Sequence, residues 1–93
     1  MVASVKKVVL DVLKPHKPNG LEFASTLAEN CPDCRVSFDV QAVDENTESV
    51  VIVIEGDDLQ YDVISETIHN MGGSVHSIDQ VEVINPRRKK TDR

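Results

Sequence analysis

The chain has 93 residues, a formal net charge of −6, three aromatic residues and no Trp. This length supports one small domain, in which aliphatic side chains must fill a thin core. No stretch approaches the roughly 20 apolar residues of a membrane-spanning helix, and the opening residues lack the apolar segment of a secretion signal. We therefore expect a cytoplasmic protein with no membrane partner.

Charge divides the chain into two parts. Residues 1–85 contain five Lys/Arg against fifteen Asp/Glu, a net charge of −10, whereas residues 86–93 contain five against one, a net charge of +4. The acidic part should repel phosphate backbones and attract cations. We predict one domain over residues 1–85 and a basic, disordered tail over residues 86–93. Nucleic-acid binding is an alternative that we disfavour. The expected central strands carry no aromatic side chains for base stacking on the sheet face, so this alternative rests on the basic tail alone.

The first elements in chain order are a strand and a helix. Apolar residues recur at every second position within residues 5–13, which predicts a strand. Pro15 and Pro18 end this strand, because proline cannot donate to a sheet ladder. Asn19 and Glu22 have the spacing of a capping box and predict the start of a helix. The expected buried stripe of that helix consists of Leu21, Phe23, Ala24, Leu27, Ala28 and Cys31.

A hairpin follows, and its second strand is the most apolar segment of the chain. Residues 35–43 alternate between apolar and polar side chains, which predicts a half-exposed strand, and residues 44–48 form the turn. The returning strand, residues 49–55, contains the run V-V-I-V-I. Because successive strand side chains point to opposite faces, both faces of this strand need cover. We expect helices to cover one face and a second subunit to cover the other.

The last elements are a helix and a strand. Asp57 and Asp58 are expected to open the helix, since carboxylates suit the positive end of its dipole. Gly72-Gly73 supplies the left-handed residue that ends it. Residues 74–84 predict the last strand, although their apolar residues cannot all share one face, which indicates a bulge near Asp79-Gln80. The expected buried stripe of the helix consists of Leu59, Val63, Ile64, Ile68 and Met71.

The order βαββαβ predicts an α+β domain with the ferredoxin-like arrangement. In this arrangement a four-stranded antiparallel sheet has strand order 4-1-3-2, and both helices lie on one face. The other face carries no helix. We therefore expect homo-oligomers that form through this helix-free face or through the edge strands.

Three segments resemble a known family. They are residues 10–16 (L-D-V-L-K-P-H), residues 44–50 (D-E-N-T-E-S-V) and residues 72–81 (G-G-S-V-H-S-I-D-Q-V). They are similar to the small archaeal proteins of the domain of unknown function 211 family, and the similarity covers about residues 4–83. The resemblance implies a ferredoxin-like fold that assembles into oligomers, and it implies no activity. The chain departs from the family pattern at Cys31-Pro32-Asp33-Cys34.

Acidic residues and histidines suggest a cation site. If the fourth strand pairs with the first so that Lys14 is opposite His76, then Asp11 is opposite Asp79. Two carboxylates that face each other across a sheet need water, a proton or a cation to relieve their repulsion. Oxygen ligands suit Ca²⁺ or Mg²⁺, whereas imidazoles suit transition metals. The alternative is that these acids are simply solvated. The predicted site consists of Asp11, His16, Asp39, His76 and Asp79.

The two cysteines leave three interpretations open. Cys31 and Cys34 follow the end of a helix, whose partial negative charge opposes thiolate formation, so the pair does not have the setting of a redox enzyme. The favoured interpretation is that Cys31 is a small core residue and Cys34 begins a strand. A zinc site would need further ligands from a second subunit or from His and acidic side chains. A reversible disulfide is the third interpretation.

Together these features predict a homo-oligomeric binding or regulatory module that takes a divalent cation, such as Ca²⁺, or a small ligand at an acidic site between subunits. The alternative is an enzyme in which His16 or His76 is a general base and Asp11 or Asp79 orients it. The sequence contains no nucleophile elbow, P-loop or glycine-rich phosphate-binding loop. The balance therefore favours a protein without catalytic activity, and the sequence does not identify its ligand.

Overall fold

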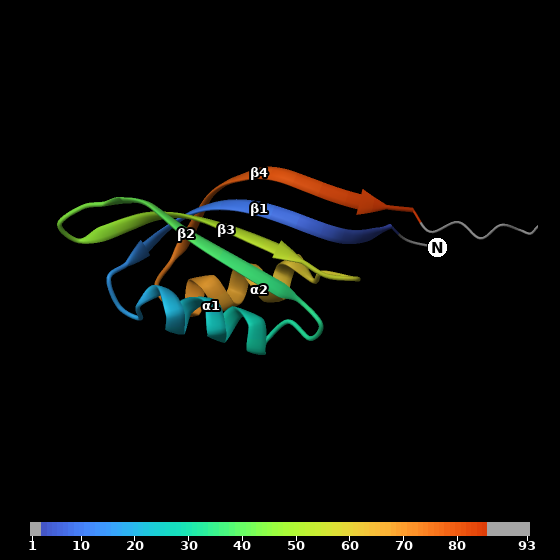
Figure 1. Cartoon of the computed structure of the whole chain (residues 1–93), viewed down its shortest axis with the longest axis horizontal. Coiled ribbons are helices and arrows are strands. Elements are labelled where there is room, and N and C mark those ends of the chain that lie inside the picture. Colours follow the sequence, from blue (N-terminus) through green and yellow to red (C-terminus); the bar gives the residue numbers. More distant parts are fainter. Residues whose placement is uncertain (1–2, 86–93) are drawn as a thin grey trace, which may run out of the picture.

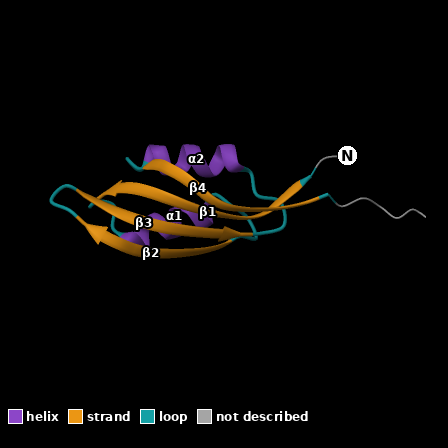
Figure 2. Ribbon diagram, turned by 90° about the horizontal axis from the view of Figure 1, so that it is seen from above, coloured by secondary structure: helices purple, strands orange, loops and turns teal. Residues whose placement is uncertain are grey.

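The computed structural model describes residues 3–85. The sheet order is β2-β3-β1-β4, and all neighbouring strands are antiparallel, as the sequence predicted (Figures 1 and 2). Both helices lie on one face of the sheet, which confirms the ferredoxin-like arrangement (Figure 1). No helix within residues 3–85 is long and apolar enough to cross a membrane. The predicted tail, residues 86–93, lies outside the described residues. The elements are β1 (Ser4–Pro15), α1 (Gly20–Glu29), β2 (Arg35–Val43), β3 (Thr47–Glu55), α2 (Tyr61–Asn70) and β4 (Ser74–Ile84).

The core lies between the two helices and the two central strands. Strands β1 and β3 pair so that Leu10 is opposite Ile52, and both side chains are completely buried. The period of two then places every second residue of each strand in the core. Burial of these aliphatic side chains is the main stabilising contribution to the fold. The other core residues include Val8, Val12, Val50 and Ile54 from the sheet and Phe23, Leu27, Ile64 and Ile68 from the helices.

The opposite face of the sheet has an apolar centre. Val9 on β1 and Val51 and Val53 on β3 point to this face and are half-buried, and Leu13 at its margin is 41% exposed. Neither helix of the described chain covers them (Figure 1). We call this surface the helix-free face. Among residues 3–85, the strand neighbours of these valines on this face include Asp11, Ser37 and Asp39.

Helix α1 begins at the capping box that the sequence predicted. The Asn19 side chain accepts a hydrogen bond from the Glu22 backbone N–H at 2.9 Å, and the Glu22 carboxylate accepts one from the Asn19 backbone N–H at 3.3 Å. Phe23 and Leu27 form the buried face of the helix. The expectation that Leu21 and Ala28 join them is wrong, because Ala28 is exposed and Leu21 is 78% exposed. Leu21 lies two residues before Phe23, which places it about 200° away around the helix axis.

The cap makes a testable contribution to stability. We expect Asn19→Ala to lower the free energy of unfolding by about 1 kcal/mol, because it removes the acceptor for an orphan backbone N–H. Urea denaturation of parent and variant measures this loss. Asn70→Ala, at the exposed end of α2, is the matched control, and we expect it to stay within about 0.5 kcal/mol of the parent. Equal losses in both variants would contradict a role for the cap.

Helix α2 begins later than the sequence indicated. Asp57-Asp58 were expected to open it, but the helix starts at Tyr61. The reason is a long-range contact: the Leu59 backbone N–H donates to the Val5 carbonyl at 2.9 Å, so this segment runs beside β1 before the helix begins. Gly72 has the expected left-handed conformation, with φ at 86°. Of the predicted stripe, Leu59, Ile64 and Ile68 are buried, Met71 is partly buried and Val63 is exposed.

Strand β4 contains two bulges on its ladder with β1. Asp79 lies between the residues that pair with Val9 and Leu10, and it has no partner of its own. This confirms the bulge that the apolar pattern indicated. His76 is a second unpaired residue nearer the start of the strand, and the sequence did not predict it. Bulges bend an edge strand and redirect its side chains, so they determine what faces β1 across this pair.

Candidate functional site

Two aspartates flank Val51 on the helix-free face. Asp39 on β2 and Asp11 on β1 both lie opposite Val51 of β3, one on each side. Two strand spacings therefore separate the two carboxylate-bearing residues, a distance of roughly 10 Å. A Ca²⁺ ion lies about 2.4 Å from each of its oxygen ligands. Within one chain, Asp11 and Asp39 could share an ion only if both side chains leaned toward each other over Val51.

The partner of Asp11 on β4 is Ser77, not Asp79. The register that placed the two carboxylates directly opposite each other is therefore wrong. It assumed that Lys14 faces His76, whereas Leu13 pairs with Ser74, and the bulge at His76 makes up only part of this difference. The Ser77 hydroxyl donates a hydrogen bond to the Asp79 carboxylate at 2.7 Å. This brings two carboxylates and one hydroxyl to the β1–β4 pair. We call Asp11, Ser77 and Asp79 the acidic cluster.

His76 lies beside this cluster, between two cavities. The first cavity, of about 290 Å³, is also lined by Asp11, Leu13 and Ser49. The second, of about 480 Å³, lies between α2 and β4, and there His69 joins His76 in the lining. The bulge at His76 explains this position, because an unpaired residue at the sheet edge can project its side chain toward either side.

The described structure gathers only part of the predicted cation site. Asp11, His76 and Asp79 lie near one another at the β1–β4 pair, whereas Asp39 is two strands away and His16 belongs to a separate network. Among residues 3–85, no three His, Cys, Asp or Glu side chains are arranged so that they could hold a metal ion. The described residues of one chain therefore do not form the predicted cation site by themselves.

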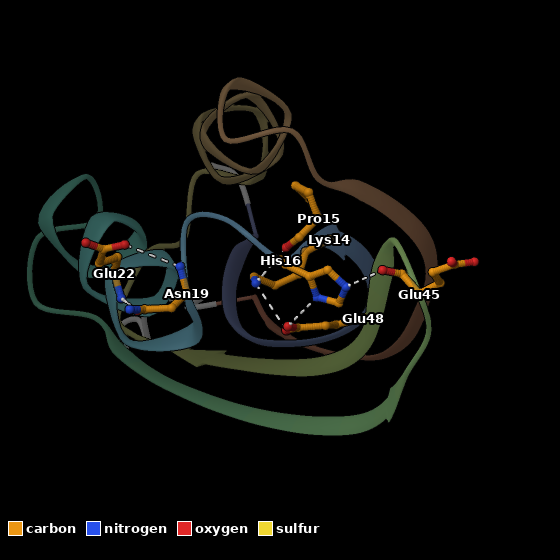
Figure 3. A network of polar contacts seen from close by, with 7 residues as sticks. All are labelled: Lys14, Pro15, His16, Asn19, Glu22, Glu45 and Glu48. Atoms are coloured by element: carbon orange, nitrogen blue, oxygen red, sulfur yellow. Dashed lines mark hydrogen bonds and ion pairs between the residues drawn. The ribbon is translucent and has the colours of Figure 1, made fainter.

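The separate network is centred on a buried lysine (Figure 3). The Lys14 side chain is 0% exposed. Its ammonium donates hydrogen bonds to the Pro15 carbonyl at 2.8 Å and to Glu48 Oε1 at 3.1 Å, and it lies 5.7 Å from the centre of the Phe23 ring. An ammonium has three N–H groups, and here two have hydrogen-bond acceptors while the ring face offers a cation–π contact. The charge is therefore buried together with its partners.

His16 connects this ion pair to the turn between β2 and β3 (Figure 3). Its Nδ1 lies 3.0 Å from Glu48 Oε2, and its Nε2 lies 2.9 Å from the carbonyl oxygen of Glu45. Both partners are acceptors, so only the protonated ring can donate to each of them. The Glu48 carboxylate, and then the Glu45 carbonyl, raise the pKa of His16. Hydrogen bonds from His16, and then from Lys14, lower the pKa of Glu48.

Sequence reasoning missed the burial of Lys14, although the sequence contains a signal for it. Lys14 continues the series Val8, Leu10 and Val12 at every second position, so the strand period places it on the core face. Glu48 continues the corresponding series of β3 and lies directly opposite Lys14. Opposite charges at matching positions of two buried strand faces indicate a buried ion pair.

The structure joins Cys31 and Cys34 in a disulfide. The favoured interpretation, in which the two thiols are unpaired, is therefore wrong, although Cys31 does belong to the core. The disulfide closes the short turn between α1 and β2. With both sulfurs in this bond, the structure offers no pair of thiolates for zinc.

Comparison with known proteins agrees with the resemblance seen in the sequence. The model of the domain of unknown function 211 family, described as uncharacterized ArCR, matches residues 6–90. An uncharacterized protein from Methanocaldococcus jannaschii is 40% identical over 77 residues, which cover 83% of this chain and 79% of that protein. These matches confirm the family that the three segments indicated.

Proposed function

The chain belongs to the domain of unknown function 211 family, and from its geometry we propose that it is a homo-oligomeric binding module. In this proposal a second copy covers the helix-free face. A divalent cation or a small ligand binds where acidic residues of the two copies meet. The module acts by binding and regulation, and no catalytic step is part of the proposal.

The observation that carries the proposal is the apolar centre of the helix-free face. Val9, Val51 and Val53 form this centre, and Asp11 and Asp39 belong to the polar residues around it. An apolar centre with a polar rim is the usual anatomy of a protein–protein interface. Strands that are apolar on both faces are normally covered on both faces, and a second copy of the chain provides a matching apolar surface.

The edge strand β4 supports the same proposal. Four of its apolar side chains are each about half exposed, although they belong to the sheet. An exposed apolar edge strand is a ready site for pairing with another chain. Ile78 and Val81 lie opposite the core residues Leu10 and Val8, so they point to the helix side of the sheet. Pairing of another copy along this edge would therefore be a contact separate from the helix-free face. The four side chains are Ile78, Val81, Val83 and Ile84.

The acidic cluster supports a cation site that is completed between chains. Asp11 and Asp79 offer two carboxylates, and Ser77 adds a hydroxyl. Ca²⁺ takes about six to eight oxygen ligands, so ligands from a second copy or from water are needed, and Asp39 of that copy is one candidate. His76 beside the cluster would favour a transition metal instead. His16 is left out of the proposed site, because both of its ring nitrogens already have partners.

Calorimetric titration with Ca²⁺, Mg²⁺, Mn²⁺ and Zn²⁺ tests the cation site. We expect the parent protein to bind at least one of these ions, and we expect Asp11→Asn and Asp79→Asn each to weaken the affinity by about tenfold or more, since each removes one anionic ligand. Asp62→Asn, on the exposed side of α2, is the matched control and should bind as the parent does. Absence of binding in the parent, or equal binding in all variants, would refute the site.

A further inference from the structure

We propose that His16 is a proton-controlled latch that holds the β2–β3 turn against the loop between β1 and α1. The ring lies in that loop, and its two nitrogens contact Glu48 at the start of β3 and the carbonyl of Glu45 in the turn (Figure 3). These contacts join segments that are 32 and 29 residues apart in the sequence. The inference is independent of the proposed cation site and of assembly.

The latch is accessible to protons. The His16 side chain is 40% exposed, so the ring can exchange its protons with solvent without unfolding of the core. The groups that face it are the Glu48 carboxylate from β3 and the backbone of Glu45 and Asp44 from the turn. Lys14 from β1 reaches the ring only through Glu48, which it also contacts. The ring therefore faces acceptors on both of its nitrogen sides.

Loss of one proton breaks one of the two contacts. A neutral imidazole keeps a single N–H. We expect this proton to stay on Nδ1, because a hydrogen bond to the Glu48 carboxylate is stronger than one to a neutral carbonyl. The lone pair of Nε2 then faces the Glu45 carbonyl oxygen, which lies 2.9 Å away in the closed form. Two acceptors at this distance repel each other, so the turn moves away from the ring.

The direction of the pH effect follows from the raised pKa of His16. The folded protein binds the proton more tightly than the unfolded chain, so the latch contributes fully to stability below the ordinary pKa of about 6.5. This contribution is lost as the pH rises through the higher pKa of the folded state. The Lys14–Glu48 contact does not use the His16 proton, so we expect it to remain. The turn is therefore released once His16 has lost this proton, while the core stays intact.

Nuclear magnetic resonance of the full-length protein tests the latch. We expect the ring of His16 to titrate above pH 6.5 and to carry its remaining proton on Nδ1. The carbonyl-carbon signal of Glu45 should move with the same midpoint. We also expect amide exchange of Asp44, corrected for its intrinsic rate, to accelerate through the same range. The corrected rate should rise about tenfold for each pH unit by which the measured pKa exceeds 6.5.

Two variants separate the latch from a general effect of pH. His16→Gln cannot titrate, so the Glu45 signal and the Asp44 exchange should lose their pH dependence. His69→Gln, on the exposed end of α2, should leave both unchanged from the parent. A pKa of His16 at or below 6.5, a neutral ring protonated on Nε2, or a Glu45 signal that still titrates in His16→Gln would overturn the proposal. If His16→Gln does not fold, the ring pKa and tautomer of the parent decide alone.

Discussion

Glu48→Leu is expected to lower the melting temperature by roughly 10 °C or more, the largest loss for removal of any single ion-pair partner among residues 3–85. Lys14 is 0% exposed, and Glu48 is its only carboxylate partner in the described structure. A buried ammonium without its counter-charge must stay desolvated or force the surrounding core open. Thermal unfolding followed by circular dichroism at pH 6 measures the effect.

The control for this prediction is another carboxylate next to a lysine. Asp57 lies 3.8 Å from Lys6, but its side chain is 98% exposed, so Asp57→Leu should leave the melting temperature nearly unchanged. The double variant Lys14→Met with Glu48→Leu should recover most of the loss, because an apolar pair of similar size replaces the ion pair. A small loss in Glu48→Leu, or no recovery in the double variant, would contradict the burial of the charge.

Val53→Lys is expected to dissociate the proposed assembly. Val53 lies at the centre of the helix-free face, opposite Val9 on β1 and Ser37 on β2. A lysine there would place an unpaired ammonium inside the interface. This should raise the dissociation constant by about 100-fold or more, while the single chain tolerates the change because the face is open to solvent. Sedimentation equilibrium of parent and variant at matched concentrations measures the difference.

Val63→Lys separates the interface from a general effect of added charge. Val63 is 42% exposed on α2, on the opposite side of the sheet from Val53. The variant should keep the same assembly state as the parent. If both variants dissociate, or if neither does, the helix-free face is not the contact surface.

The order and pairing of the elements could be predicted from the sequence because local patterns specify them. Single elements are identified by the alternation in residues 35–43, the apolar run in residues 50–54 and the capping box at Asn19. The order of the elements along the chain then selects the ferredoxin-like arrangement among the possible topologies. The bulge near Asp79 was also predictable, because its apolar neighbours fall out of phase with a regular strand.

The site could be predicted only in part, because it depends on contacts between distant segments. The second bulge, at His76, leaves Val75 and Ile78 three positions apart, which indicates an irregularity but does not specify the partner of each residue on β1. The pairing of Asp11 with Ser77 could therefore not be predicted. The late start of α2 depends on a backbone hydrogen bond from Leu59 to β1. Periodicity describes one element at a time, and it does not specify the register between two of them.

The burial of Lys14 was missed for a different reason. Charged residues are almost never fully buried unless they are paired, so a lysine next to Pro15 is naturally interpreted as the exposed end of a strand. The pairing of β1 with β3 shows that Lys14 lies opposite Glu48 at the end of the core face, where the two side chains form an ion pair. The Glu48 carboxylate also contacts the His16 ring, and this contact is part of the proposed latch.

The most direct test of the account is the mass of the parent chain in solution. Light scattering at dilute concentration and near-physiological salt should give a particle of at least twice 10.3 kDa, because we propose that a second copy covers the valines of the helix-free face. A particle of 10.3 kDa under these conditions would contradict the assembly and every site that is proposed to form between its subunits.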